Sequence, residues 1–248
     1  MNSTNPFFRN KSFSSNNEKV YEAEVIGAEQ TMTVDGTINK SFIMLLLLVA
    51  SALFIWSIEN SLVFAVGGAI VGFILVLIAS FKPQASPYLA PGYAIFEGFF
   101  IGGISVLFEA MYPGIVIQAV GATFITFLTC FALYKFQIVK VTEQFRAIVI
   151  GSTMAIATFY LISWLVSLFV PSFQPIHHGN SLLSIGISVF VIVIAAMNLF
   201  LDFDQIERGV AQKQPKYMEW FGAMGLMITL VWLYVEFLRL LSKLSSRK

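Results

Sequence analysis

The chain has 248 residues, of which 57% are hydrophobic and only 12% charged, and its formal net charge is +1. A soluble domain carries about a quarter charged residues, so this composition excludes an ordinary soluble enzyme and indicates an integral membrane protein. The small net charge and the lack of a basic patch interleaved with aromatic residues give no reason to expect nucleic acid as a partner.

The first part of the chain, residues 1–36, is rich in Ser and Asn and poor in apolar residues. Such a composition predicts a mobile tail, which we expect on the cytoplasmic side. The segment contains no short apolar stretch that ends in a small-residue cleavage site. We therefore expect no cleaved signal peptide, and residues 37–248 to form one membrane domain.

Seven apolar runs follow, each close to the 20 or so residues that a helix needs to cross the hydrocarbon core. Polar, Pro-containing or Gly-containing breaks separate them. The predicted spans are Phe42–Ile58, Leu62–Phe81, Tyr88–Met111, Ile115–Tyr134, Ala147–Val170, Leu182–Leu201 and Trp220–Leu241. The sequence thus predicts an all-α integral membrane protein with a bundle of seven transmembrane helices.

Basic residues gather in alternate connections between these runs, and the other connections contain no Lys or Arg. This alternation places the N-terminus in the cytoplasm. Lys243, Arg247 and Lys248 conflict with it, because seven crossings put the C-terminus outside; we nevertheless expect the seventh helix to cross fully. The cytoplasmic cations are Lys40, Lys82, Lys135, Lys140, Arg146, Arg208, Lys213 and Lys216.

Carboxylates lie where a bilayer would ordinarily exclude them. An ionised carboxylate at mid-membrane costs about 2.5–3.5 kcal/mol, so such a group usually faces a partner or a water-filled path. Asp202, Asp204 and Glu207 close the sixth run. Asp202 follows the apolar stripe and is the best candidate to face the bundle interior. The alternative is that all three residues mark the interface with water. For Asp202 this interpretation is as good as a position facing the interior, and for Asp204 and Glu207 it is the better one.

Glu236 lies well inside the seventh run, and Arg239 shares its helix face. A local Glu236–Arg239 pair is the plain alternative to a functional role. In the third run, Glu97 precedes Gly98, which forms a close-packing motif with Gly102. Glu97 either bonds a neighbouring hydroxyl or lines the same polar path as Glu236.

Several enzyme classes fail for want of residues, and we expect neither an enzyme nor a cofactor. The two histidines, His177 and His178, lie in a loop between runs, without further ligands for a metal. A retinal protein needs a lysine within the seventh helix, and Lys243 lies only at its end. No glycine-rich phosphate loop occurs.

Two motifs resemble a known family. Asp202-Phe203-Asp204-Gln205-Ile206 and Leu233-Tyr234-Val235-Glu236-Phe237-Leu238-Arg239-Leu240 are similar to the last two helices of the Bax inhibitor-1 family, in its bacterial YccA/YetJ branch. Asn5-Pro6 and Met32-Thr33-Val34-Asp35-Gly36 also look like bacterial members. The seven-span layout fits across nearly the whole chain, whereas the specific motifs are confined to the last two helices.

The resemblance implies a helix bundle with the last helix at its centre, in the bacterial cytoplasmic membrane. It also implies a pH-sensitive calcium leak controlled by two acidic residues, at the positions of Asp202 and Glu236. Two carboxylates in contact would share a proton and latch the helices, and their oxygens suit a transient Ca²⁺. The chain departs from the family in two ways. Glu replaces the usual Asp at position 236, and the connection between the two acids is longer than in the family. If the two acids do not meet, Glu97 is the substitute partner.

Two other functions stay open. The first is a membrane-embedded regulatory protein that binds a protease or a translocation complex, as YccA-type relatives suggest, with the N-terminal tail as the contact. The second is a proton-coupled transporter of a small solute that uses Glu97 and Glu236. The expected partners are membrane lipid, Ca²⁺ or another cation, and in the regulatory case a membrane protein.

Overall fold

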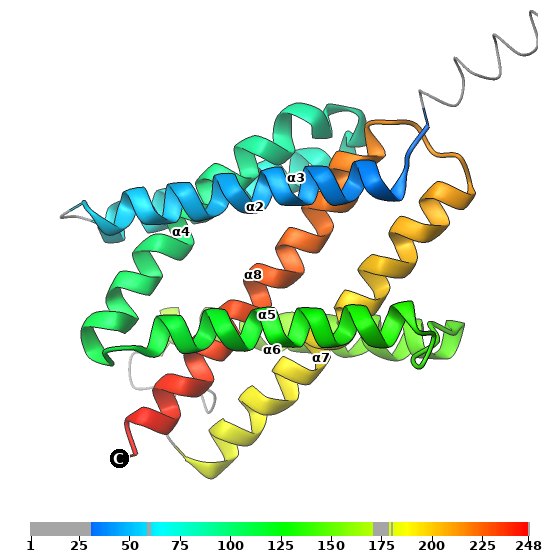
Figure 1. Ribbon diagram of the computed structural model, residues 1–248. Coiled ribbons are helices and arrows are strands. Elements are labelled where there is room, and N and C mark those ends of the chain that lie inside the picture. Colours follow the sequence, from blue (N-terminus) through cyan, green and yellow to red (C-terminus); the bar gives the residue numbers. More distant parts are fainter. Residues whose placement is uncertain (1–30, 59–60, 171–178, 180, 248) are drawn as a thin grey trace, which may run out of the picture.

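The computed structural model describes residues 31–58, 61–170, 179 and 181–247 (Figure 1). The tail predicted up to residue 36 therefore lies mostly outside the described residues. Within them are seven α-helices long and apolar enough to cross a membrane, and no β-strand, which confirms the predicted fold class. These are α2 (Val34–Trp56), α3 (Ser61–Phe81), α4 (Ser86–Met111), α5 (Ile115–Lys135), α6 (Glu143–Phe169), α7 (Leu182–Ala211) and α8 (Met218–Ser245); a 3₁₀ turn, η2 (Pro83–Ala85), precedes α4.

Several helices extend beyond their apolar runs. The Thr33 hydroxyl accepts from the Gly36 N–H and caps α2, so this helix starts at Val34, inside the segment predicted as tail. At the other extreme, α7 continues to Ala211 and carries Asp202 well inside a helix. Hydropathy detects only the apolar stretch of a helix, so the predicted spans left out the polar ends of α2 and α7.

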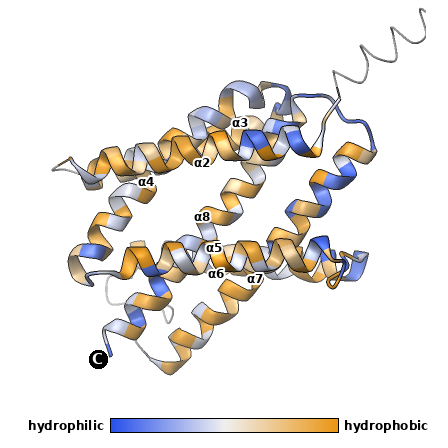
Figure 2. Cartoon of the chain, viewed as in Figure 1, coloured by the Kyte–Doolittle hydropathy of each residue, from blue (hydrophilic) through white to orange (hydrophobic). Residues whose placement is uncertain are grey.

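The last helix is central, as the family resemblance implied. In Figure 1, α8 crosses the middle of the bundle, and it packs against α2, α4, α5 and α7. Met227, Leu233 and Leu238 lie on it with at most 2% exposure. Hydrophobic residues dominate the middle of every helix, whereas hydrophilic residues gather toward the helix ends (Figure 2).

Glycines bring α4 against α2. A Cβ atom on Gly98 would lie 2.1 Å from the Ser51 Oγ, and one on Gly102 would lie 2.6 Å from the Ala52 carbonyl oxygen. Both distances are shorter than any real contact, so only glycine permits this approach. The spacing of Gly98 and Gly102 predicted such a contact face.

One end of the bundle holds most of the cations, and we call it the basic end. The residues just before α2 meet the α7–α8 connection there, where the Met32 N–H donates to the Gln214 carbonyl at 2.7 Å. At the same end α6 meets α7, because Arg146 pairs with Asp204. The beginnings of α2 and α8 and the end of α7 therefore share one side of the membrane.

A buried carboxylate ties α8 to α2 at this end. Glu219 is fully buried and accepts hydrogen bonds from the Thr33 N–H at 2.9 Å and the Thr33 hydroxyl at 2.8 Å. It also pairs with Lys40 of α2 and, at 2.9 Å, with Lys216. A Cβ on Gly36 would occupy the space of the carboxylate. We call this arrangement the Glu219 clamp.

Candidate functional site

Asp202 faces the central helix across a gap left by a glycine. A Cβ on Gly225 of α8 would lie 4.0 Å from the Asp202 Oδ1, and the Thr229 side chain, one turn further along α8, lies near the same carboxyl group, although its hydroxyl donates to the Gly225 carbonyl at 3.4 Å. The other oxygen, Oδ2, is buried and has no hydrogen-bond partner. A buried polar atom without a partner is costly, so this oxygen needs a proton, water or a cation.

Glu236 lies deep in the same helix pair, with 1% exposure. Its Oε1 accepts from Arg239 at 3.0 Å and from the Tyr160 hydroxyl of α6 at 3.3 Å. The local Glu236–Arg239 pair expected as the plain alternative therefore exists, and the guanidinium also stacks over the Tyr160 ring. Even so, Oε2 is buried without a partner. The ion pair satisfies only half of this carboxylate.

Lys243 completes a polar cluster around Glu236. The lysine is 6% exposed and donates to the Ser184 carbonyl at 3.1 Å and to the Ser188 hydroxyl at 2.7 Å, both on α7. It lies two turns beyond Glu236 on the same face of α8 and interacts with it electrostatically. Lys243 thus packs α8 against α7 and is not a cation of a free tail. Of the three tail cations that conflicted with a full crossing, it therefore no longer counts.

The structure does not bring Asp202 and Glu236 together. Asp202 contacts Thr229, which precedes Glu236 by seven residues, or about 10 Å along the axis of α8. No hydrogen bond or ion pair between the described residues joins the two acids. The longer connection between the two acids, noted in the sequence, explains this separation. Because α8 begins at Met218, Glu236 lies several turns along the helix from the basic end.

An apolar layer separates the two acids. Ala195 and Leu199 of α7 and Leu233 of α8 have no exposed surface and belong to one hydrophobic cluster. Along the two helices, Leu199 and Leu233 fall between the Asp202–Thr229 level and Glu236, and Ala195 lies at about the level of Glu236. The α7–α8 interface therefore contains two carboxylates at different depths, with a dry layer between them.

Glu97 lies at a different interface. It is 9% exposed on α4, and a Cβ on Gly72 of α3 would lie 3.0 Å from its Oε2. The ring of Tyr93, on the preceding turn of α4, borders the same Gly72 position. No hydrogen bond or ion pair within the described part of the chain connects Glu97 to Asp202 or Glu236. The α3–α4 interface thus keeps Glu97 from acting as the substitute partner in this conformation.

The remaining acids of α7 belong to the basic end. Asp204 pairs with Arg146 of α6 and, at 2.8 Å, with Arg208 one turn along α7. Glu207 accepts a hydrogen bond from the Tyr134 hydroxyl of α5. These contacts agree with interfacial roles for Asp204 and Glu207 that hold α5, α6 and α7 together.

The described residues contain no group of three or more His, Cys, Asp or Glu side chains that could hold a metal ion. His177 and His178 lie outside those residues. Ca²⁺ takes six to eight oxygen ligands, more than Asp202 and Thr229 supply. A cation at this level would therefore be bound transiently, with water completing its shell.

In a comparison with protein families, residues 5–246 match the family described as Bax inhibitor 1 like. No curated protein matches the chain significantly. The family match agrees with the seven spans and with the two motifs of the last two helices. Because it extends over nearly the whole chain, this multi-pass membrane protein belongs to the Bax inhibitor-1 family.

Proposed function

We propose that this protein is a pH-sensitive cation leak channel, with Ca²⁺ as the favoured ion, and that the ion passes along the α7–α8 interface. The observation that carries the proposal is the pair of buried, unpartnered carboxylate oxygens at this interface, Asp202 Oδ2 and Glu236 Oε2. Acidic groups in this position are expensive and usually mark an ion or proton pathway. Carboxylate oxygens are also the hard ligands that Ca²⁺ prefers.

The two acids act at separate levels of the path. Asp202 with Thr229 is the level near the basic end, and Glu236 with its polar cluster is the level nearer the opposite end. Leu199 and Leu233 close the path between them, with Ala195 beside the Glu236 level, because an apolar layer without water is a barrier to an ion. This arrangement replaces the proton-sharing acid pair as the gate.

The direction of the pH response follows from burial. Protonated, each carboxyl group is neutral and can remain in the dry interface. Raising the pH ionises it, and an ionised carboxylate in an apolar environment requires water or a cation, which Arg239 supplies to only one oxygen of Glu236. Ionisation therefore favours a wider, wetter α7–α8 interface, so flux should rise with pH and fall on acidification.

The test is Ca²⁺ entry into dye-loaded proteoliposomes at acid and neutral pH. We expect pH-dependent flux from the wild type, and loss of that pH dependence in Asp202→Asn and Glu236→Gln. Asp204→Asn and Glu97→Gln are matched controls, because both remove a carboxylate outside the path, and they should keep the wild-type response. Unchanged pH dependence in both path variants would overturn the mechanism.

The same experiment tests the leak itself. Flux no greater than that of empty liposomes at either pH would overturn the channel assignment and favour the regulatory protein expected as the alternative. Flux that requires a co-transported solute would favour the transporter. We place the channel in the bacterial cytoplasmic membrane, as the resemblance to bacterial members implies, and we place the basic end in the cytoplasm on the strength of the positive-inside pattern.

A further inference from the structure

A long slot runs between α2 and α5, with α8 as its floor. Each of these two helices packs on α8, but they share no substantial packing with one another. The half of the slot at the basic end is a cavity of about 810 Å³, and a second cavity of about 210 Å³ continues it toward the opposite end. The two cavities share the lining residues Leu45, Phe124, Met227 and Leu230.

The slot crosses the hydrocarbon core and is long enough to hold a membrane lipid chain of one leaflet lengthwise. Its α2 wall extends from Val34 to Trp56, which is about 33 Å of helix and close to the 30 Å or so of a bilayer core. Phe42, on α2, is 61% exposed and Leu128, on α5, is 58% exposed at the slot. In a membrane these side chains face hydrocarbon, so the slot opens sideways into the lipid.

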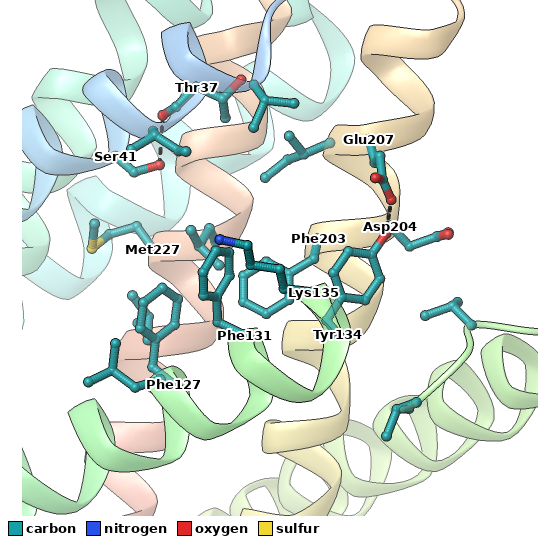
Figure 3. Close-up of a pocket in the computed structure, with 18 of the residues that line it drawn as sticks. Thr37, Ser41, Phe127, Phe131, Tyr134, Lys135, Phe203, Asp204, Glu207 and Met227 are labelled. Carbon is teal, nitrogen blue, oxygen red and sulfur yellow. Dashed lines mark hydrogen bonds between the residues drawn. The ribbon is translucent and has the colours of Figure 1, made fainter. Parts of the chain in front are cut away.

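Polar side chains occur mainly at one end of the larger cavity. Figure 3 shows Phe127, Phe131, Tyr134 and Lys135 in a row along α5, so that the row changes from apolar to polar as it nears the basic end. Lys140, in the connection after α5, lines the same end. An occupant that matches this wall has an apolar tail and a polar head at the basic end.

The charges at this end favour an anionic head. The acids Asp204 and Glu207 are already engaged, by two arginines and by the Tyr134 hydroxyl respectively. Lys135 and Lys140 are exposed and take part in no ion pair among the described residues. Two cations without a carboxylate partner, placed where a helix leaves the membrane, attract phosphate groups of anionic lipids.

We propose that this slot is a binding site for an anionic phospholipid of the leaflet at the basic end. One acyl chain lies between α2 and α5 on the Met227–Leu230 face of α8, and the phosphate lies between Lys135 and Lys140. The proposal does not depend on ion conduction. Since the chain would rest on α8, it would also support the helix that carries Gly225, Thr229 and Glu236.

The test uses the full chain in liposomes that contain chain-spin-labelled phosphatidylglycerol or phosphatidylcholine, and measures the motionally restricted fraction of each lipid. For the wild type we expect phosphatidylglycerol to be restricted in preference to phosphatidylcholine. Replacing Lys135 and Lys140 with Gln should lower that preference by about fivefold for each lysine. Lys82→Gln with Lys213→Gln removes two cations at the same end but outside the slot, and should leave the preference unchanged.

A second pair of variants tests the apolar part of the slot. Leu128→Trp places a large ring at the slot, whereas Ile125→Trp does so on the lipid-facing surface of α5 outside the slot; both positions are exposed, so both variants should fold. Leu128→Trp should reduce the restricted fraction of phosphatidylglycerol, and Ile125→Trp should not. Equal restriction of the two lipids by the wild type, or full preference in the double Gln variant, overturns the proposal. A change of oligomeric state in Leu128→Trp, with lipid restriction unchanged, would instead identify the slot as a contact between protein copies.

Discussion

Glu236 combines an ion pair with an unsatisfied oxygen, and these two contacts have different consequences. Arg239 is 39% exposed, whereas Glu236 is 1% exposed and depends on groups within the protein for compensation. Removing the arginine would leave a buried carboxylate with the Tyr160 hydroxyl, the Trp232 side chain and the more distant Lys243 for compensation. Losing one partner of a buried pair is costly because the other charge remains in the apolar interior.

We therefore expect Arg239→Gln to destabilise the protein, by up to about 3–5 kcal/mol and by less where water reaches the pair. Combining Arg239→Gln with Glu236→Gln removes both charges and should recover part of the loss. Thermal unfolding of the wild type, the two single variants and the double variant in detergent measures the coupling. Additive losses would contradict an interaction between the two side chains.

At the scale of the helices, small residues decide how closely α2, α3 and α4 approach. Gly98 and Gly102 face α2, and Gly103 faces α3, where its Cβ would lie 2.5 Å from that of Ala65. Such contacts transmit any movement of α4 directly to its two neighbours. The α7–α8 interface differs, because Gly225 there leaves room for a carboxylate instead of a backbone.

Gly98→Ala should therefore destabilise the bundle by about 1–3 kcal/mol, the usual cost of overpacking, because the new methyl group would meet Ser51 and the Leu48 carbonyl at 2.5 Å or less. Gly121→Ala is the matched control on α5, since a Cβ there meets nothing within 4 Å. The unfolding temperature of each variant is the measurement. Equal effects of the two substitutions would show that Gly98 is not a close contact.

At the scale of the whole molecule, hydropathy and the positive-inside pattern predicted seven spans and their direction. The spans are confirmed because lipid imposes the apolar run of about 20 residues that was searched for. The relative depth of Asp202 and Glu236 could not be predicted in this way. It depends on where α7 ends and α8 begins, and both helices continue past their apolar runs.

Two residues of the structural network escaped the sequence analysis. Glu219 reads as an interfacial charge, since its partners Thr33 and Lys40 lie 186 and 179 residues away in the chain. Lys243 reads as a tail cation, although its seven-residue spacing from Glu236 places both on one helix face and could have indicated a shared cluster. Contacts distant in sequence leave no local pattern, and this limits how much of a polar site a single sequence predicts.

The side of the membrane that the basic end occupies is also testable on the whole molecule. Cys130 is buried, so a cysteine added at Lys140, which is exposed, should be the main site of labelling by a membrane-impermeant maleimide. We expect labelling of Lys140→Cys in inverted vesicles and not in intact spheroplasts. A cysteine at Tyr112, in the turn at the opposite end, should show the reverse. Labelling of Lys140→Cys from outside would contradict a cytoplasmic N-terminus.

The Glu219 clamp fixes one end of α8, so the helix can tilt only about that end. The clamp holds the first turn of α8 to α2, so any tilt of α8 pivots there, and displacement grows with distance from the pivot. Thr229 lies about 15 Å from Glu219 along the axis and Glu236 about 25 Å, so Glu236 travels about 1.7 times as far. Opening at the far end would have to break the Lys243 contacts with Ser184 and Ser188 of α7, and the apolar layer would then wet from the Glu236 side before Thr229 moved away from Asp202.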